Sequence, residues 1–420
     1  MTTMSTSATQ TGDTLVHWQS PRLQAEWLRA NQDARVIRDV LAQNGALDFP
    51  TYESGLTPAS ALSGELGTET GMGFAWVRDN CYAAYALLLA GDQAKASGVV
   101  RALLRIFATY EHMLDAVITG AADPNDIMTR PPARVVGDTL GLTGNWSNAQ
   151  NDSIGYTLWV VAEFVQHGAL QLTAEDWDII TKLARYLNTI EYWHDADNGH
   201  WEEDRQLHAA SIGAVVAGLS AVSDIAPATL DWGLDLDQLI TDGRTALNQS
   251  LIDVPLDASV LFLVEPLRIV TADQTAQIIA MVEQNLRREI GIIRYPNDSY
   301  WAADYRDHFG LGDRTADFSD RMDERAKFSL EGHEAQWTIF DPMLSCYYSR
   351  RYAETNDEQY LQKSRYYLER SLASYEEREG KWLVPEAYFF EHGQWVANDH
   401  VPLLWSQANL IAALRAIEDQ

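Results

Sequence analysis

The feature that most constrains this chain is a repeated alternation between helical segments and short loops rich in Trp, Tyr, Asp and Gly. Within the helical segments apolar residues recur every three or four positions, whereas strand signals are scarce. The pattern therefore predicts an all-helical fold. Helices are expected over Pro21–Ala46, Asp79–Ala90, Gln93–Thr109, Ser153–His167, Thr173–Trp193, Leu207–Ser223, Asp235–Leu251, Thr271–Arg288, Glu334–Thr355, Asp357–Arg378 and Val401–Glu418.

The alternation runs through the whole chain, and no Pro-, Ser- or Gly-rich linker divides it. We therefore expect one domain over residues 15–420. Roughly a dozen helices with short connections suit either a double ring of helices, an (α/α)6 toroid, or a solenoid. The toroid is preferred because a solenoid normally shows a fixed sequence repeat, and none is found. Residues 1–14 lack the basic and apolar regions of a secretion signal and are expected to form a disordered polar leader.

Composition limits the partners of the chain. Its formal net charge of −29 repels phosphate backbones and anionic lipid, and no apolar run is long enough to span a membrane. Nucleic acid and membranes are therefore poor partners, whereas a neutral sugar escapes the repulsion. An equally good explanation is that the charge serves solubility alone. Cys81 and Cys346 stand in apolar helical contexts, which favours buried thiols and a cytoplasmic location.

Tryptophans next to carboxylates gather in the loops and at their borders. Aromatic faces that stack on sugar rings, together with charged groups that bind hydroxyls, are typical of carbohydrate pockets. Each cluster alone is better explained by core packing or, for Asp79 and Asp152, by helix capping. Several together favour a sugar site. The clusters are Trp76-Val77-Arg78-Asp79, Trp146 ahead of Asn151-Asp152, Trp201-Glu202-Glu203, Tyr300-Trp301 after Asp298, Glu334-Ala335-Gln336-Trp337, and Pro385-Glu386 followed by Trp405.

Hydrolysis of a glycosidic bond needs one protonated and one ionised carboxyl group. Glu202 is a candidate acid, because an aromatic neighbour and a second carboxylate both favour its protonated form, and Glu203 could exchange roles with it. Glu386, in an aromatic loop, is a candidate base. The residues alone leave Glu334 and Asp79 as competitors for either role.

Metal and cofactor sites are not expected. The histidines and aspartates between His194 and His208 match no familiar ligand spacing. Gly71 and Gly73 lack both the lysine and the preceding strand of a phosphate-binding loop, and no Gly-x-Ser-x-Gly motif is present.

The same motifs carry a family resemblance. From about Thr68 to Leu414 the chain resembles the catalytic domain of glycoside hydrolase family 15, which contains glucoamylases, glucodextranases and some trehalases. The resemblance implies the (α/α)6 fold and an inverting, exo-acting hydrolase that releases glucose from the non-reducing end of soluble α-glucosides, without a cofactor. The motifs are Trp76-Val77-Arg78-Asp79-Asn80, the stretch from Gly144 to Asp152, Trp201-Glu202-Glu203, Arg294-Tyr295, Glu334-Ala335-Gln336-Trp337, Pro385-Glu386 and Trp405-Ser406.

The resemblance also separates the roles of the carboxylates. It implies Glu202 as general acid and Glu386 as general base, with the two carboxyls about 6.5–9.5 Å apart, as inversion requires. Arg78 and Asp79 would bind the outermost glucose. The other implied binding residues are Trp76, Trp146, Asp152, Trp201, Glu203, Arg294, Glu334, Trp337 and Trp405.

Two other functions stay open. Regulatory subunits of phosphorylase kinase keep the same fold, so a glucan-binding protein without turnover is an alternative. A sugar isomerase or epimerase on the same toroid would need a histidine pair in the pocket, for which His208 and His333 are candidates. The linkage that is cleaved cannot be read from the sequence.

Overall fold

The structure is a computed structural model that describes residues 16–61, 71–298, 300–301, 322–328 and 331–420. The predicted leader, residues 1–14, lies outside the described residues, as does Thr68, where the family resemblance begins.

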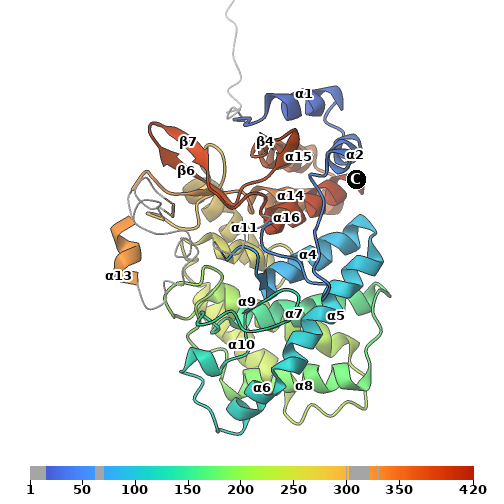
Figure 1. The fold of residues 1–420 in the computed structure, drawn as a ribbon, viewed down its shortest axis with the longest axis vertical. Coiled ribbons are helices and arrows are strands. Elements are labelled where there is room, and N and C mark those ends of the chain that lie inside the picture. The colour runs from blue at the N-terminus through green and yellow to red at the C-terminus, as the bar shows by residue number, and fades with distance from the viewer. Residues whose placement is uncertain (1–15, 62–70, 299, 302–321, 329–330) are drawn as a thin grey trace, which may run out of the picture.

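Helices make up most of the described chain (Figure 1), as predicted. The α-helices are α1 (Pro21–Arg29), α2 (Ala34–Asn44), α4 (Val77–Ala90), α5 (Gln93–Thr109), α6 (Glu111–Ile118), α7 (Asn151–Gln166), α8 (Ala174–Thr189), α9 (Ala209–Ile225), α10 (Leu236–Ser250), α11 (Ala272–Met281), α13 (Met322–Arg325), α14 (Asp341–Thr355), α15 (Glu358–Ala373) and α16 (Leu404–Glu418). Three 3-10 helices, η1 (Ile127–Thr129), η2 (Ala258–Leu263) and η5 (Ala326–Phe328), and a π-helical turn, η3 (Val282–Leu286), complete the set.

The helices form an inner and an outer ring. The inner elements α4, α7, α9, η2 and α16 consist largely of small or apolar residues and are buried on nearly all sides, and α14 is buried over its first half. The outer helices α5, α8, α10 and α15 bury one face and leave the other in solvent. Each outer helix precedes an inner element in the chain, so inner and outer positions alternate.

The inner ring is closed. Helix α4 packs on α7, α7 on α9, and α9 on η2. Phe262 of η2 then contacts Phe340, the residue at the start of α14, with ring centroids 5.8 Å apart. Helix α14 packs on α16, and α16 packs back on α4. This double ring confirms the predicted (α/α)6 toroid and excludes a solenoid.

The closest contact in the inner ring joins α7 and α9. Gly155 of α7 lies against the backbone of Ala214 in α9, and Gly218 of α9 lies against the carbonyl of Gly155. A side chain at either glycine would meet backbone atoms of the other helix. The two helices therefore approach one another through glycine.

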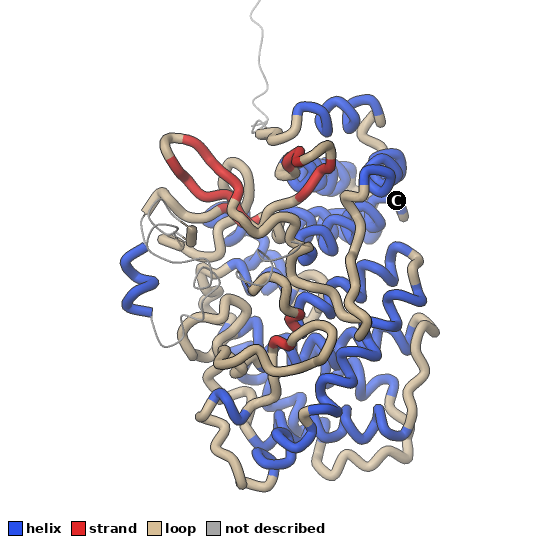
Figure 2. The backbone as a smooth tube through the Cα atoms, viewed as in Figure 1, coloured by secondary structure: helices blue, strands red, loops and turns tan. Residues whose placement is uncertain are grey.

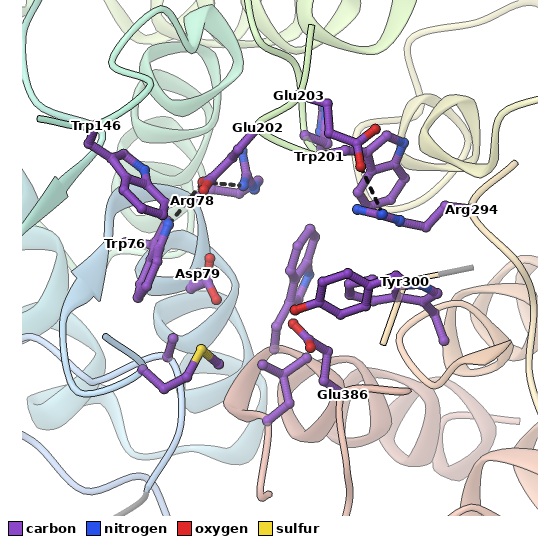
Figure 3. A pocket seen from close by; sticks show the side chains of 16 residues that line it. Trp76, Arg78, Asp79, Trp146, Trp201, Glu202, Glu203, Arg294, Tyr300 and Glu386 are labelled. Carbon is purple, nitrogen blue, oxygen red and sulfur yellow. Dashed lines mark hydrogen bonds and ion pairs between the residues drawn. The ribbon is translucent and has the colours of Figure 1, made fainter. Parts of the chain in front are cut away.

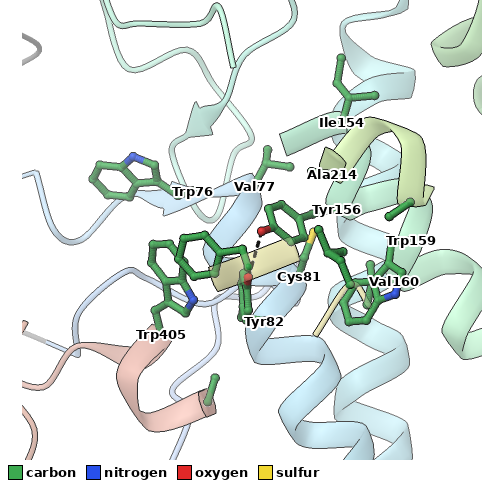
Figure 4. Close-up of a cluster of buried hydrophobic side chains, with 14 of the residues drawn as sticks. Trp76, Val77, Cys81, Tyr82, Ile154, Tyr156, Trp159, Val160, Ala214 and Trp405 are labelled. Atoms are coloured by element: carbon green, nitrogen blue, oxygen red, sulfur yellow. Dashed lines mark hydrogen bonds between the residues drawn. The ribbon is translucent and has the colours of Figure 1, made fainter. Parts of the chain in front are cut away.

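Buried side chains from the inner helices form a large part of the core (Figure 4). At its centre, Tyr82 of α4 donates a hydrogen bond to the hydroxyl of Tyr156 in α7 at 3.0 Å, and its ring packs against Trp405 of α16. Cys81 is buried beside them, and Cys346 is partly buried. Burial raises the pKa of both thiols. Within the described residues, no helix has the length and apolar character needed to cross a bilayer.

Several predicted helix bounds were wrong. The segment predicted as one helix over Pro21–Ala46 is broken between α1 and α2, where Asn31 and Gln32 adopt left-handed backbone conformations. The predicted helix over Glu334–Thr355 begins only at α14, because residues before it form a strand. The predicted helix over Asp357–Arg378 ends with α15, because Glu376–Arg378 form a strand.

The strands are short and lie in the connections between helices (Figure 2). β6 and β7 form a hairpin whose two-residue turn, His392-Gly393, has positive φ at both positions, as this turn type requires. β3 pairs with β6, so that Trp337 lies opposite Ala387. The strands are β1 (Ala75–Trp76), β2 (Arg134–Val135), β3 (Gln336–Trp337), β4 (Glu376–Arg378), β5 (Lys381–Leu383), β6 (Ala387–Glu391) and β7 (Gln394–Ala397).

Candidate active site

A pocket opens at the end of the toroid where the inner helices begin (Figure 3). All predicted site residues line it except Asp152 and Glu334. The other lining residues were not predicted to bind substrate. Two of them, Tyr300 and His200, belong to segments that the sequence analysis considered. The lining residues are Ala59, Met72, Trp76, Arg78, Asp79, Trp146, His200, Trp201, Glu202, Glu203, Arg294, Tyr300, Trp337, Glu386, Leu403 and Trp405.

Glu202 lies in the loop before α9, with its side chain largely buried. Trp76, at the start of α4, donates its indole N–H to Glu202 Oε1 at 2.9 Å. Arg78 donates to the same oxygen at 3.3 Å. The backbone of Glu202 has a φ of 58°, a conformation that costs of order 1–3 kcal/mol for a non-glycine residue and concentrates at functional sites. The surrounding loop is closed by a backbone bridge between Asp197 and Gln206, which supports this conformation.

Arg78 forms a buried ion pair with Asp152. The guanidinium of Arg78 is buried and donates to Asp152 Oδ2 at 2.7 Å and to Gln150 Oε1 at 3.2 Å. Burial acts to raise the pKa of Asp152, but the charge of Arg78 and its hydrogen bond outweigh burial and lower the pKa. Asp152 stands in the first turn of α7 and does not cap it, because the N-cap residue is Gln150. The alternative capping explanation for Asp152 is therefore wrong.

Asp79 stands in the first turn of α4 and lines the pocket between the two glutamates. It is not the N-cap of α4 either, because that position belongs to Trp76. Burial raises the pKa of Asp79 to about 7, and the nearby charges of Glu202 and Glu386 act in the same direction while Arg78 opposes them. Asp79 can therefore be protonated or ionised near neutral pH.

Glu386 comes from the loop before β6 and reaches the pocket from the side opposite Glu202 (Figure 3). Its Oε2 accepts hydrogen bonds from Asn398 Nδ2 at 2.7 Å and from His400 Nδ1 at 2.8 Å. The Glu386 side chain is 11% exposed. Sequence reasoning missed both donors, because they follow Glu386 across a hairpin that was read as a loop.

Glu203 belongs to a second buried ionic cluster beside the pocket. Arg294 donates to Glu203 Oε1 at 2.9 Å and forms two hydrogen bonds with Asp298. Tyr295 donates its hydroxyl to Glu203 Oε2 at 2.6 Å. Since both oxygens of Glu203 already accept hydrogen bonds, one from Arg294 and one from Tyr295, this side chain is poorly placed to exchange roles with Glu202.

Aromatic rings form the walls of the pocket. Trp76 and Trp146 meet edge to face at 5.9 Å, and Tyr300 stacks on Trp337 at 5.3 Å. Trp405 lies beneath Arg78, whose guanidinium carbon is 5.4 Å from its ring. Flat apolar faces beside hydrogen-bonding charges are the surfaces that a sugar ring needs.

Glu334 and the two candidate histidines, His208 and His333, do not line the pocket. Glu334 is buried outside the pocket lining and accepts from the backbone N–H of Asn297 at 3.2 Å. His200 does line the pocket, but burial lowers its pKa to about 3, so it is neutral. Among the described residues, no group of His, Cys, Asp and Glu has the arrangement of a metal site.

The helical toroid and this aromatic, carboxylate-bearing pocket define a glycosidase-type protein. The chain belongs to the glycosyl hydrolases family 15, whose model matches residues 36–420. This confirms the family predicted from the motifs.

Two kinds of relative support the assignment. The chain is 28% identical over 256 residues to isomaltose glucohydrolase of Kribbella flavida; the match covers 54% of this chain and 63% of that protein, less than two thirds of its length. A solved wild-type glycosidase superposes with a TM-score of 0.66 at 22% identity and covers 94% of this chain and 98% of its own. Glucoamylase from Saccharomycopsis fibuligera gives 0.61 at 13% identity and covers 92% and 96%. At these identities the two structures show the fold alone.

Proposed function

We propose that this chain is an inverting, exo-acting hydrolase that releases glucose from the non-reducing end of soluble α-glucosides. In this proposal Glu202 is the general acid and Glu386 the general base. The observation that carries it is that two carboxyl groups from distant loops face one another across a single aromatic pocket (Figure 3). Inversion needs this opposed arrangement, because water must attack from the side opposite the leaving oxygen.

The surroundings of the two glutamates suit their proposed roles. Trp76 and Arg78 fix one oxygen of Glu202, which orients the carboxyl that must deliver its proton to the glycosidic oxygen. Glu386 removes a proton from the attacking water. The sugar gains positive charge in the transition state, and the carboxylates around it stabilise that charge.

The remaining predicted residues divide into three groups. Arg78 and Asp79 bind hydroxyls of the outermost glucose, while Trp76, Trp146 and Trp405 provide apolar walls. Trp201, Glu203, Arg294 and Trp337 lie together on the other side of the pocket and bind the next sugar unit. Asp152 acts through Arg78, since it is fully buried behind it. Glu334, which the resemblance implied as a binding residue, lies outside the pocket lining.

The assignment is tested with E202Q and E386Q, which keep the shape of each side chain and remove its acid–base function. Purified protein is assayed on maltose, isomaltose, trehalose and kojibiose; isomaltose is included because the Kribbella relative is an isomaltose glucohydrolase. NMR of the first anomer released reports the stereochemistry. We expect β-glucose from the unmodified protein and a fall in kcat by at least about a thousandfold in each variant.

α-Glucosyl fluoride separates the two roles, because its leaving group departs without a proton. E202Q should recover much of its turnover on this substrate and E386Q should not. Release of α-glucose, or unchanged turnover in either variant, contradicts the proposal. Tight binding of these sugars with no glucose released from any of them identifies the glucan-binding alternative instead. The isomerase alternative is not favoured, because neither His208 nor His333 reaches the pocket.

A further inference from the structure

We propose that His400 is a positioning residue for the catalytic base. With Asn398, it holds Oε2 of Glu386 and leaves Oε1 as the oxygen that removes the proton from water. This inference rests on the proposed role of Glu386.

The backbone brings the two donors to the base. β6 and β7 pair with Tyr388 opposite Ala397, and the pairing continues beyond the strands. The N–H of Asn398 donates to the carbonyl of Ala387, and the N–H of Glu386 donates to the carbonyl of His400, each at 3.0 Å. The hairpin therefore fixes the residues after β7 beside the residue before β6, although they are separate in sequence.

The side chains then converge on one oxygen. Asn398 Nδ2 lies 2.7 Å and His400 Nδ1 lies 2.8 Å from Glu386 Oε2. An ionised carboxylate can only accept, so His400 carries a proton on Nδ1 and donates it. Oε1 of Glu386 accepts no hydrogen bond from the described residues, and Glu386 lines the pocket, where substrate and water enter.

His400 has little freedom to leave this position. Its side chain is fully buried, as is that of Asn398. The imidazole packs against the Trp301 ring with centroids 4.8 Å apart at 69°. Among the described residues, Nε2 has no hydrogen-bond partner, so the buried ring makes its one polar contact to the protein through Nδ1.

This arrangement gives the two oxygens different tasks. In the reaction a water O–H bond breaks, its proton goes to Oε1, and the water oxygen forms a bond to the anomeric carbon. The glycosidic C–O bond breaks, and the leaving oxygen takes the proton of Glu202. The two donors on Oε2 stabilise the ionised carboxylate and prevent it from rotating, so Oε1 stays aimed at the water.

The test compares H400L with H400N. Leucine and asparagine have nearly the same shape and leave the same space beside Trp301, but only asparagine can place an N–H where Nδ1 stands. We expect kcat to fall between tenfold and a hundredfold in H400L, with KM changed less than about threefold. H400N should recover most of that loss. A purely structural role for His400 predicts equal losses in both variants and would refute the proposal.

Two further measurements show whether His400 acts through Glu386. H400L should lose turnover on α-glucosyl fluoride as well as on disaccharides, as expected for the base side of the reaction. In an E386A background, H400L should cause no further loss of residual turnover, because the group that it positions is gone. An additional loss there refutes the inference and leaves the role of Glu386 intact. Full turnover in E386A overturns the proposed function itself.

Discussion

The glycine contact between α7 and α9 gives a sharp test of how the inner ring is held. A Cβ atom added at Gly155 would lie 2.4 Å from the carbonyl carbon of Ala214 and 2.5 Å from its oxygen. Ordinary contacts begin at 3.4 Å, so the helices must separate by about 3.4 − 2.4 = 1.0 Å. The obstacle is backbone and cannot turn away as a side chain can.

The expected magnitude follows from two opposing effects. Overpacking of a tight interior costs about 1–3 kcal/mol, and a backbone clash belongs at the upper end. Alanine gains about 1 kcal/mol over glycine within a helix. G155A should therefore lower the free energy of unfolding by about 2 kcal/mol. The matched control is G98A in α5, where an added Cβ meets nothing within 4 Å; the same change there should stabilise the protein by up to about 1 kcal/mol.

Urea unfolding of the three proteins, followed by circular dichroism, measures this difference through the midpoint at unchanged slope. G155A should also lower kcat, because α7 begins with the residues that hold Arg78, and a displacement of about 1 Å at an active site can cost about a hundredfold. A midpoint for G155A at or above that of the unmodified protein would refute the argument that backbone contact fixes the spacing of α7 and α9.

Two further predictions concern single polar groups. W76F removes the indole N–H that fixes Glu202 and should lower kcat on disaccharides about tenfold, but much less on α-glucosyl fluoride; equal losses on both substrates would show that Trp76 does not act through the acid. Burial raises the pKa of Asp197 to about 7 from 3.8, so the unfolded chain ionises this group first as the pH rises. The contribution of Asp197 to stability is therefore complete below about pH 4 and lost progressively up to about pH 7. The urea midpoint of D197N, relative to that of the unmodified protein, should therefore be higher at pH 7.5 than at pH 4.5. A difference between the two proteins that does not depend on pH would contradict this assignment.

The sequence predicts a helix correctly where residues within or next to the segment are sufficient to determine its structure. Gln93–Thr109 coincides with α5, because Asp92 caps it and apolar residues recur on a single face. The strands β1 and β3 were missed because their pairing is not local: β3 becomes a strand only by lying against β6, far along the chain. The helix α6, which follows α5 after a single residue, was not predicted.

The motif positions predicted most of the residues that line the pocket, but not the hydrogen bonds that position them. Glu202 and Glu386 line one pocket, as expected. Their partners could not be deduced, since the bond from Trp76 to Glu202 crosses between different loops and the contact of His400 with Glu386 depends on hairpin register. Asp152 was expected in the pocket because its motif is known, yet the geometry of α7 turns it behind Arg78.

The closure of the inner ring by α16 against α4 has a consequence for how the protein folds. The backbone N–H of Leu404 bonds to the carbonyl of Ala59, and Trp405 packs on Tyr82, so the last helix completes a contact with one of the first. Contacts between distant segments slow folding, because the chain loses loop entropy before they form. During synthesis the earlier inner helices therefore keep apolar surface exposed until α16 has been made. The protein is most prone to aggregation in this period.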